Sequence, residues 1–219
     1  MRSSPHHVSD VMTRAVVAVG RKALFKDIVE RMEQWQVSAL PVLEGDGRVI
    51  GVVSEADLLP KEEFREGDPD RFTQLHRLSD LAKAGAVTAE ELMSTPAVTV
   101  HADAALAEAA RVMALRNVKR LPVVSAEGLL EGVVSRGDLL KVFLRPDNEL
   151  ADEIRRDVVE PLFPAPVEPV HIAVAEGVAT LTGRVRLGDA ARIPLAARLA
   201  RGVEGVVRVD CRLTAADTE

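Results

Sequence analysis

The chain has 219 residues, of which 47% are hydrophobic and 28% are charged, and its formal net charge at pH 7 is −6. This composition is typical of a globular protein with enough chain for one large domain or two smaller ones. The acidic balance argues against a nucleic-acid binder, which concentrates basic residues. The single cysteine, Cys211, excludes an internal disulfide.

The sequence carries no signal for export, membrane insertion or catalysis. Its start, MRSSPHHVSDVMTR, lacks the apolar run of a signal peptide, and no stretch approaches the roughly 18 apolar residues of a membrane span. The histidines are scattered, and neither a P-loop nor a zinc-type Cys/His cluster is present. We therefore predict a cytoplasmic, non-enzymatic protein with no catalytic residue, no metal site and no required cofactor.

A duplication occupies the first 145 residues or so. The strings GVVSEADLL at 51–59 and GVVSRGDLL at 132–140 differ only in their two middle positions. The offset of 81 residues between them, applied without a gap, also aligns other identical pairs: Met12 with Met93, Pro41 with Pro122, and Gly47 with Gly128. Such self-similarity is the signature of an internal repeat.

Each copy predicts the element order β-α-β-β-α. In the first copy, a short strand at 16–19 precedes a helix with apolar residues at helical spacing from Phe25 to Met32. The strand LPVL, a turn at 44–47, the strand VIGVV and a helix that opens at Ser54 follow. The second copy repeats this order from a strand at 98–100 to a helix at Ser135. Because a copy of about 50 residues has little core of its own, we expect the two to pack as one unit.

The rest of the chain predicts a linker and a smaller domain. Between the copies, the charged stretch 60–72 is typical of a loop, and 75–84 predicts a short helix. After a helix at 150–159 and a proline-rich stretch at 160–169, strands hinged at Glu176-Gly177 lead to a helix at 189–200 and a final strand. The predicted order is β-β-α-β.

Two explanations fit the repeated Ser-x-x-Asp. A serine at a helix start caps the first turn, and an acidic residue three positions later completes a capping box. Alternatively, the free N–H groups of the helix start bind a phosphate while the aspartate accepts hydrogen bonds from the two hydroxyls of a ribose. The second explanation describes a nucleotide site.

The duplicated pattern, with Leu-Pro-Val before the turn and Gly-Val-Val-Ser-x-x-Asp-Leu-Leu after it, resembles a tandem pair of CBS domains, the cystathionine-β-synthase type. The resemblance implies a regulatory pair that binds AMP, ADP, ATP or S-adenosylmethionine in clefts between the repeats, and that associates as a homodimer. By position, it implies that Asp57 and Asp138 hold ribose hydroxyls and that Ser54 and Ser135 meet the phosphate or ribose. It also places the backbone around Ala39 and Arg120 near the adenine.

The positions that differ between the copies carry charge. The second copy has Lys119, Arg120 and Arg136 where the first has Ser38, Ala39 and Glu55. A bound phosphate needs positive charge, so if each ligand is served by its own copy, the Asp138 site is the better nucleotide site. The same basic groups reach the other site if the clefts lie near a pseudo-twofold axis, and they serve as solvated surface charges if neither site binds.

The C-terminal segment, with Gly-Val-Ala-Thr-Leu-Thr-Gly before a helix and Gly-Val-x-x-Val after it, resembles a BON domain. That resemblance implies contact with phospholipid or with a partner protein. Seven arginines against three acidic residues between 184 and 212 are suited to an anionic partner or to a solvated face.

The sequence thus predicts an α+β (mixed α/β) protein in four parts: a first CBS repeat at 8–60, a charged linker with a short helix at 61–87, a second repeat at 88–145 and a BON-like domain at 149–214. The leading hypothesis is a sensor that binds an adenosyl ligand in the CBS pair and signals to the BON-like domain. The rival is an adaptor with unliganded repeats, whose BON-like domain binds a protein or an anionic membrane.

Overall fold

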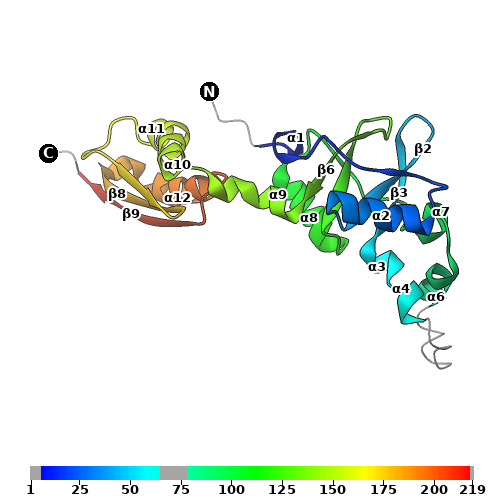
Figure 1. The fold of residues 1–219 in the computed structure, drawn as a ribbon. Coiled ribbons are helices and arrows are strands. Elements are labelled where there is room, and N and C mark those ends of the chain that lie inside the picture. Colours follow the sequence, from blue (N-terminus) through cyan, green and yellow to red (C-terminus); the bar gives the residue numbers. More distant parts are fainter. Residues whose placement is uncertain (1–5, 65–77, 218–219) are drawn as a thin grey trace. The chain divides into compact units, whose positions relative to one another are not determined.

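The structure is a computed structural model, and it describes residues 6–64 and 78–217. The chain divides into two compact units, one spanning His7–Arg136 and the other built mainly from Gly137–Glu219. The fold is mixed α/β, with small three-stranded sheets and helices (Figure 1). Residues 65–77, where part of the predicted linker falls, lie outside the described residues.

The first repeat forms a sheet in the order β1-β2-β3. After the one-turn helix α1 (Val8–Val11), its elements are β1 (Val19–Gly20), α2 (Phe25–Trp35), β2 (Ala39–Glu44), β3 (Arg48–Ser54) and α3 (Glu55–Leu58). Strand β1 pairs parallel with β2, and β2 pairs antiparallel with β3. Ile28 and Met32 of α2 are buried against this sheet, as the helical spacing predicted.

The second repeat reproduces the first. Its elements are α7 (Ala89–Leu92), β4 (Val100–His101), α8 (Leu106–Leu115), β5 (Arg120–Val124), β6 (Leu130–Ser135) and α9 (Arg136–Leu140). The sheet order is β4-β5-β6, with the same parallel and antiparallel pairings. The predicted β-α-β-β-α order is confirmed in both repeats. Between the repeats lie the short helices α4 (Pro60–Glu63) and α6 (Leu78–Gly85), so the stretch expected to be a loop from residue 60 begins with a helical turn.

The segment that enters each repeat first adds to the sheet of the other repeat. Thr13 and Val133 exchange two backbone hydrogen bonds of 2.9 Å, and Ser94 and Val52 make the equivalent pair at 2.9 and 3.2 Å. The chain then crosses back to its own sheet, where Val19 pairs with β2. This crossing explains why the predicted strand at 16–19 is shorter and later than expected.

Glycine is required where the crossing segments contact the sheets. A Cβ on Gly132 would lie 2.8 Å from Met12 Sδ and 2.9 Å from the carbonyl oxygen of Thr13, and a Cβ on Gly51 would overlap the Met93 side chain. The repeated glycine therefore makes room for the methionine of the other repeat.

The C-terminal unit has a three-stranded sheet covered by helices. Helix α9 and a 3₁₀ turn, η1 (Lys141–Leu144), lead into α10 (Asp147–Ile154), the π-helical η2 (Arg155–Val159) and α11 (Glu160–Leu162). The elements β7 (His171–Ala175), β8 (Val178–Arg186), the 3₁₀ helix η3 (Leu187–Arg192), α12 (Ile193–Arg201) and β9 (Arg208–Ala216) follow. Strand β8 is central, antiparallel to β7 and parallel to β9, which confirms the β-β-α-β order.

This unit has its own hydrophobic core. Leu150 and Ile154 of α10, Leu181 of β8 and Ala196 of α12 are each at most 1% exposed and belong to one cluster. Asp147 ties the start of α10 to the β7–β8 turn, because its carboxylate accepts the backbone N–H groups of Glu176 and Gly177 at 2.9 and 3.0 Å.

Substituting Gly132→Ala tests the crossed contact. We expect it to lower the free energy of unfolding by about 1–3 kcal/mol, because the added methyl group meets a backbone oxygen that cannot move without breaking the Thr13–Val133 pair. Gly20→Ala is the matched control, since a Cβ there meets nothing within 4 Å. Equal urea-unfolding free energies for the two variants would contradict the packing role.

Candidate functional site

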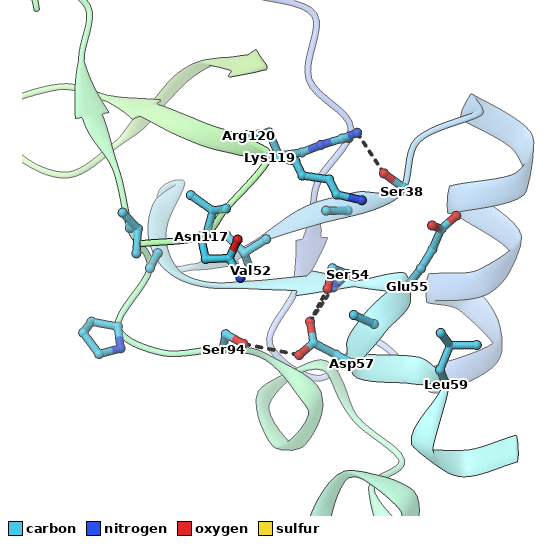
Figure 2. Close-up of a pocket in the computed structure, with 16 residues that line it drawn as sticks. Ser38, Val52, Ser54, Glu55, Asp57, Leu59, Ser94, Asn117, Lys119 and Arg120 are labelled. Carbon is cyan, nitrogen blue, oxygen red and sulfur yellow. Dashed lines mark hydrogen bonds between the residues drawn. The ribbon is translucent and has the colours of Figure 1, made fainter. Parts of the chain in front are cut away.

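A pocket of about 430 Å³ lies between the two repeats of the first unit (Figure 2). Its walls come from four places: the start of β2, the end of β3 with α3, the crossing segment 94–98, and residues 117–120 at the start of β5. Its volume lies within the range of about 300–1,000 Å³ of small-molecule sites. Because two walls belong to each repeat, the pocket exists only where the repeats meet.

Asp57 lies on one side of this pocket and is 8% exposed. Its Oδ2 accepts the backbone N–H of Ser54 at 2.8 Å and the Ser54 hydroxyl at 2.6 Å. This is the helix-start arrangement that the Ser-x-x-Asp spacing predicted, and it fixes the carboxylate at the first turn of α3.

The second oxygen of Asp57 serves other elements. Oδ1 accepts the Ser94 hydroxyl at 3.3 Å and forms an ion pair with the Lys83 ammonium of α6. The side chains of Lys83 and Asp57 are 20% and 10% exposed, so the pair is largely removed from water. One carboxylate therefore both caps its own helix and binds groups from outside it.

The opposite side of the pocket is basic. Figure 2 shows Lys119 and Arg120 extending from the start of β5 toward Ser38, and Arg120 Nη2 donates to Ser38 Oγ at 2.9 Å. Ser38 immediately precedes β2, just as Lys119 immediately precedes β5, so the basic pair and Ser38 lie at the starts of these two strands. The pocket thus offers a carboxylate at one side and two cations at the other, with Glu55 the second acidic group in its wall.

The structure groups the predicted site residues differently from the expectation of one ligand per copy. Ala39, Ser54, Asp57, Lys119 and Arg120 all line this pocket. The two basic residues were assigned to the Asp138 site if each copy serves its own ligand, but the crossed packing of the repeats places them at the Asp57 pocket.

The remaining predicted residues do not line this pocket: Ser135, Arg136 and Asp138. Asp138 forms an ion pair with Lys141, one turn further along, at 2.7 Å. Ser135 pairs with Arg120 in the antiparallel register of β5 and β6. Both aspartates of the repeated string therefore form an ion pair with a lysine. The lysine of Asp138 follows it by three residues, whereas the lysine of Asp57 comes from α6 between the repeats.

The sequence did not point to two polar residues that line the pocket, Ser94 and Asn117, or to Lys83, which pairs with Asp57. Ser94 aligns with Thr13, so the repeat alignment already offered a hydroxyl there, while Asn117 precedes the basic pair by two positions. Lys83 gave no signal because it lies between the repeats and aligns with nothing in the repeated pattern.

The residues that the structure describes hold neither a candidate membrane span nor a candidate metal cluster. No helix there is long and apolar enough to cross a membrane. No group of three or more His, Cys, Asp or Glu side chains there could hold a metal ion.

Comparison with known families agrees with this architecture. The CBS domain family matches residues 8–61 and 89–145, and the BON domain family matches residues 146–217. The chain therefore belongs to the CBS-domain proteins and carries a CBS pair followed by a BON domain.

Individual relatives match the CBS pair. Uncharacterized protein MJ1426 of Methanocaldococcus jannaschii is 28% identical over 153 residues, which is 63% of this chain and 90% of the relative. The chloroplastic CBS domain-containing protein CBSX2 of Arabidopsis thaliana is 29% identical over 136 residues, and the match spans 56% of each chain.

Solved structures share the fold. The crystal structure of CBSX2 in complex with AMP is 27% identical with a TM-score of 0.56, and the match covers 64% of this chain and 97% of that one. The CBS domain pair of protein MJ0100 is 18% identical with a TM-score of 0.50, over 64% of this chain and 97% of that one. The latter supports the fold alone.

Replacing Asp57 by Asn tests its structural contribution. We expect the free energy of unfolding to fall by about 1–3 kcal/mol, because hydrogen bonds to a charged acceptor weaken and the Lys83 ammonium loses its partner. The exposed Asp46→Asn is the control, and urea denaturation is the measurement. A loss no larger than in the control would show that the contacts of Asp57 contribute nothing to folding.

Proposed function

We propose that the protein is a regulatory sensor that binds a phosphate-bearing adenosyl ligand, such as AMP, ADP or ATP, in the Asp57 pocket. One observation carries the proposal: a buried carboxylate and two basic side chains face one pocket from different repeats. The AMP complex of CBSX2, whose fold this chain shares, supports the choice of ligand class.

The chemistry of a nucleotide suits the two sides of the pocket. Ribose hydroxyls donate hydrogen bonds to the Asp57 carboxylate, which is a strong, charge-assisted acceptor. The phosphate then extends toward Lys119 and Arg120, where opposite charge stabilises it in a partly desolvated site. The purine packs between the apolar walls, to which Val52, Val98 and Val118 contribute.

Thermal unfolding of the full chain with AMP, ADP, ATP and S-adenosylmethionine tests this assignment. At 100 times its dissociation constant, a ligand that binds only the native state adds about 2.7 kcal/mol, which raises the midpoint by several degrees. We expect the shift with AMP to be lost in Asp57→Asn and kept in Asp138→Asn. Calorimetric titration of the same proteins gives the affinities.

The outcomes separate the two aspartates. A shift lost in Asp138→Asn but kept in Asp57→Asn would move the ligand to the second aspartate. No shift with any of the four compounds would contradict the sensor and favour the adaptor, in which the Ser-x-x-Asp string acts only as a helix cap.

A second role is proposed for the C-terminal unit, because its arginines gather on one face of the sheet. On β8, the buried residues Ala179, Leu181 and Val185 point to one face of the sheet, and the even-numbered residues point to the other. The parallel register pairs these even-numbered residues with even-numbered residues of β9, so both sets share the second face. The exposed face carries four arginines: Arg184, Arg186, Arg208 and Arg212. Such a face is suited to an anionic surface.

Ion pairs neutralise part of this face. Arg184 pairs with Glu168 at 3.1 Å, and Arg212 pairs with Asp210 at 2.6 Å. The hydrogen bond from Arg212 lowers the pKa of Asp210, so this carboxylate stays charged at neutral pH. We therefore assign the attraction for an anionic surface to Arg186 and Arg208.

Co-sedimentation with phosphatidylglycerol vesicles tests the second role. We expect binding of the full chain at low salt, and its weakening by roughly 30-fold in Arg186→Ser/Arg208→Ser, since each basic residue near an anionic surface contributes about 1 kcal/mol. Arg31→Ser/Arg111→Ser, on α2 and α8, removes the same charge from the first unit and should change little. Equal weakening in both double variants, or no sedimentation of the wild type, would end this assignment.

Signalling from the CBS pair to the BON domain, and the homodimer that the family resemblance implies, remain parts of the proposal. For signalling, the ligand has to bind one arrangement of the first unit more tightly than another, because a ligand shifts an equilibrium only by its differential affinity.

A further inference from the structure

The oxygen of Asp57 that a ribose would use is already occupied. Oδ2 is committed to the N–H and hydroxyl of Ser54. Oδ1 forms the ion pair with Lys83 and receives the 3.3 Å hydrogen bond of Ser94. A ligand hydroxyl that binds this carboxylate therefore competes with an ammonium group of the protein itself.

Lys83 is held at this place by the helices between the repeats. Lys61 of α4 donates to the Ala84 carbonyl oxygen of α6 at 2.9 Å, and its ammonium lies 5.3 Å from the centre of the Phe25 ring. Lys83 itself accepts a backbone hydrogen bond from Ala86 at 3.1 Å, which closes the end of α6. The backbone that follows Lys83 is thus anchored to α4.

The cost of displacing Lys83 depends on the charge of the ligand. Its side chain is only 20% exposed, and an ammonium that loses its counter-charge in such a place is poorly compensated by water. An uncharged nucleoside takes the carboxylate and brings no replacement charge, and a sulfonium-bearing ligand adds a further positive charge. A phosphate brings negative charge into the same pocket, and although it extends toward Lys119 and Arg120, its charge also attracts the displaced ammonium in this partly desolvated site.

We infer that Lys83 determines the ligand specificity of the Asp57 pocket, by opposing adenosyl ligands that lack an anionic group and admitting those that carry a phosphate. The inference rests on the proposed function and adds to it a residue from outside the repeats. Lys119 and Arg120 attract the phosphate, whereas Lys83 acts against the ligands that have none.

Calorimetric titration of adenosine and AMP into the wild type and Lys83→Met tests the inference. Removing the competing ammonium should tighten adenosine binding by at least fivefold and change AMP binding less, so that the preference for AMP over adenosine falls. Lys26→Met, an exposed position on α2, controls for the loss of one positive charge. Lys83→Arg keeps the charge and should retain most of the wild-type preference, and circular dichroism checks that each variant is folded.

The outcomes distinguish this inference from the proposed function. Adenosine affinity that is unchanged or weaker in Lys83→Met, while AMP still binds the wild type, overturns the role of Lys83 alone. Equal tightening of adenosine and AMP also overturns it, because Lys83 would then compete without regard to charge. Failure of AMP and adenosine to bind either the wild type or Lys83→Met overturns the proposed function, and this inference with it.

Discussion

The contact between each methionine and the glycine of the opposite repeat is the constraint on which the first unit depends. Met12 lies against Gly132 and Met93 against Gly51, at the points where the entering segments join the sheets. The start of the second repeat also completes the core of the first, since Leu92 of α7 is fully buried there. Neither repeat has a complete sheet or core without the other, so the two form one structural unit.

This crossing makes the pocket a composite of both repeats. The first contributes the carboxylate of Asp57, and the second contributes the segment that carries Ser94 and the cations Lys119 and Arg120. Divergence between the copies therefore does not produce one basic site and one acidic site, as a comparison of copy with copy suggests. It places charges of both copies around one cavity, with opposite charges on its two sides.

Much of this could be predicted from the sequence, because it depends on periodicity and repetition. The 81-residue offset gave the element order, and the Ser-x-x-Asp spacing gave the capped helix at Ser54. The strand predicted at 16–19 is shorter in the structure and begins later, at Val19. Its length depends on where the chain crosses between the sheets, which no local sequence pattern indicates. Lys83 could not be predicted as a partner of Asp57, since their pairing depends on how α6 packs beside α3 and not on a repeated motif.

The two explanations of the Ser-x-x-Asp string are compatible, because they use different oxygens of the same carboxylate. Oδ2 holds the start of α3, whereas Oδ1 meets Ser94 of the crossing segment and Lys83 of α6. A ligand that takes Oδ1 leaves the helix cap in place and changes the contacts of α6. The elements whose contacts respond to occupancy are then the crossing segment, which adds to the first sheet, and helix α6 between the repeats. A carboxylate that is rigid on one side and exchangeable on the other can report ligand binding without loosening the fold that holds it.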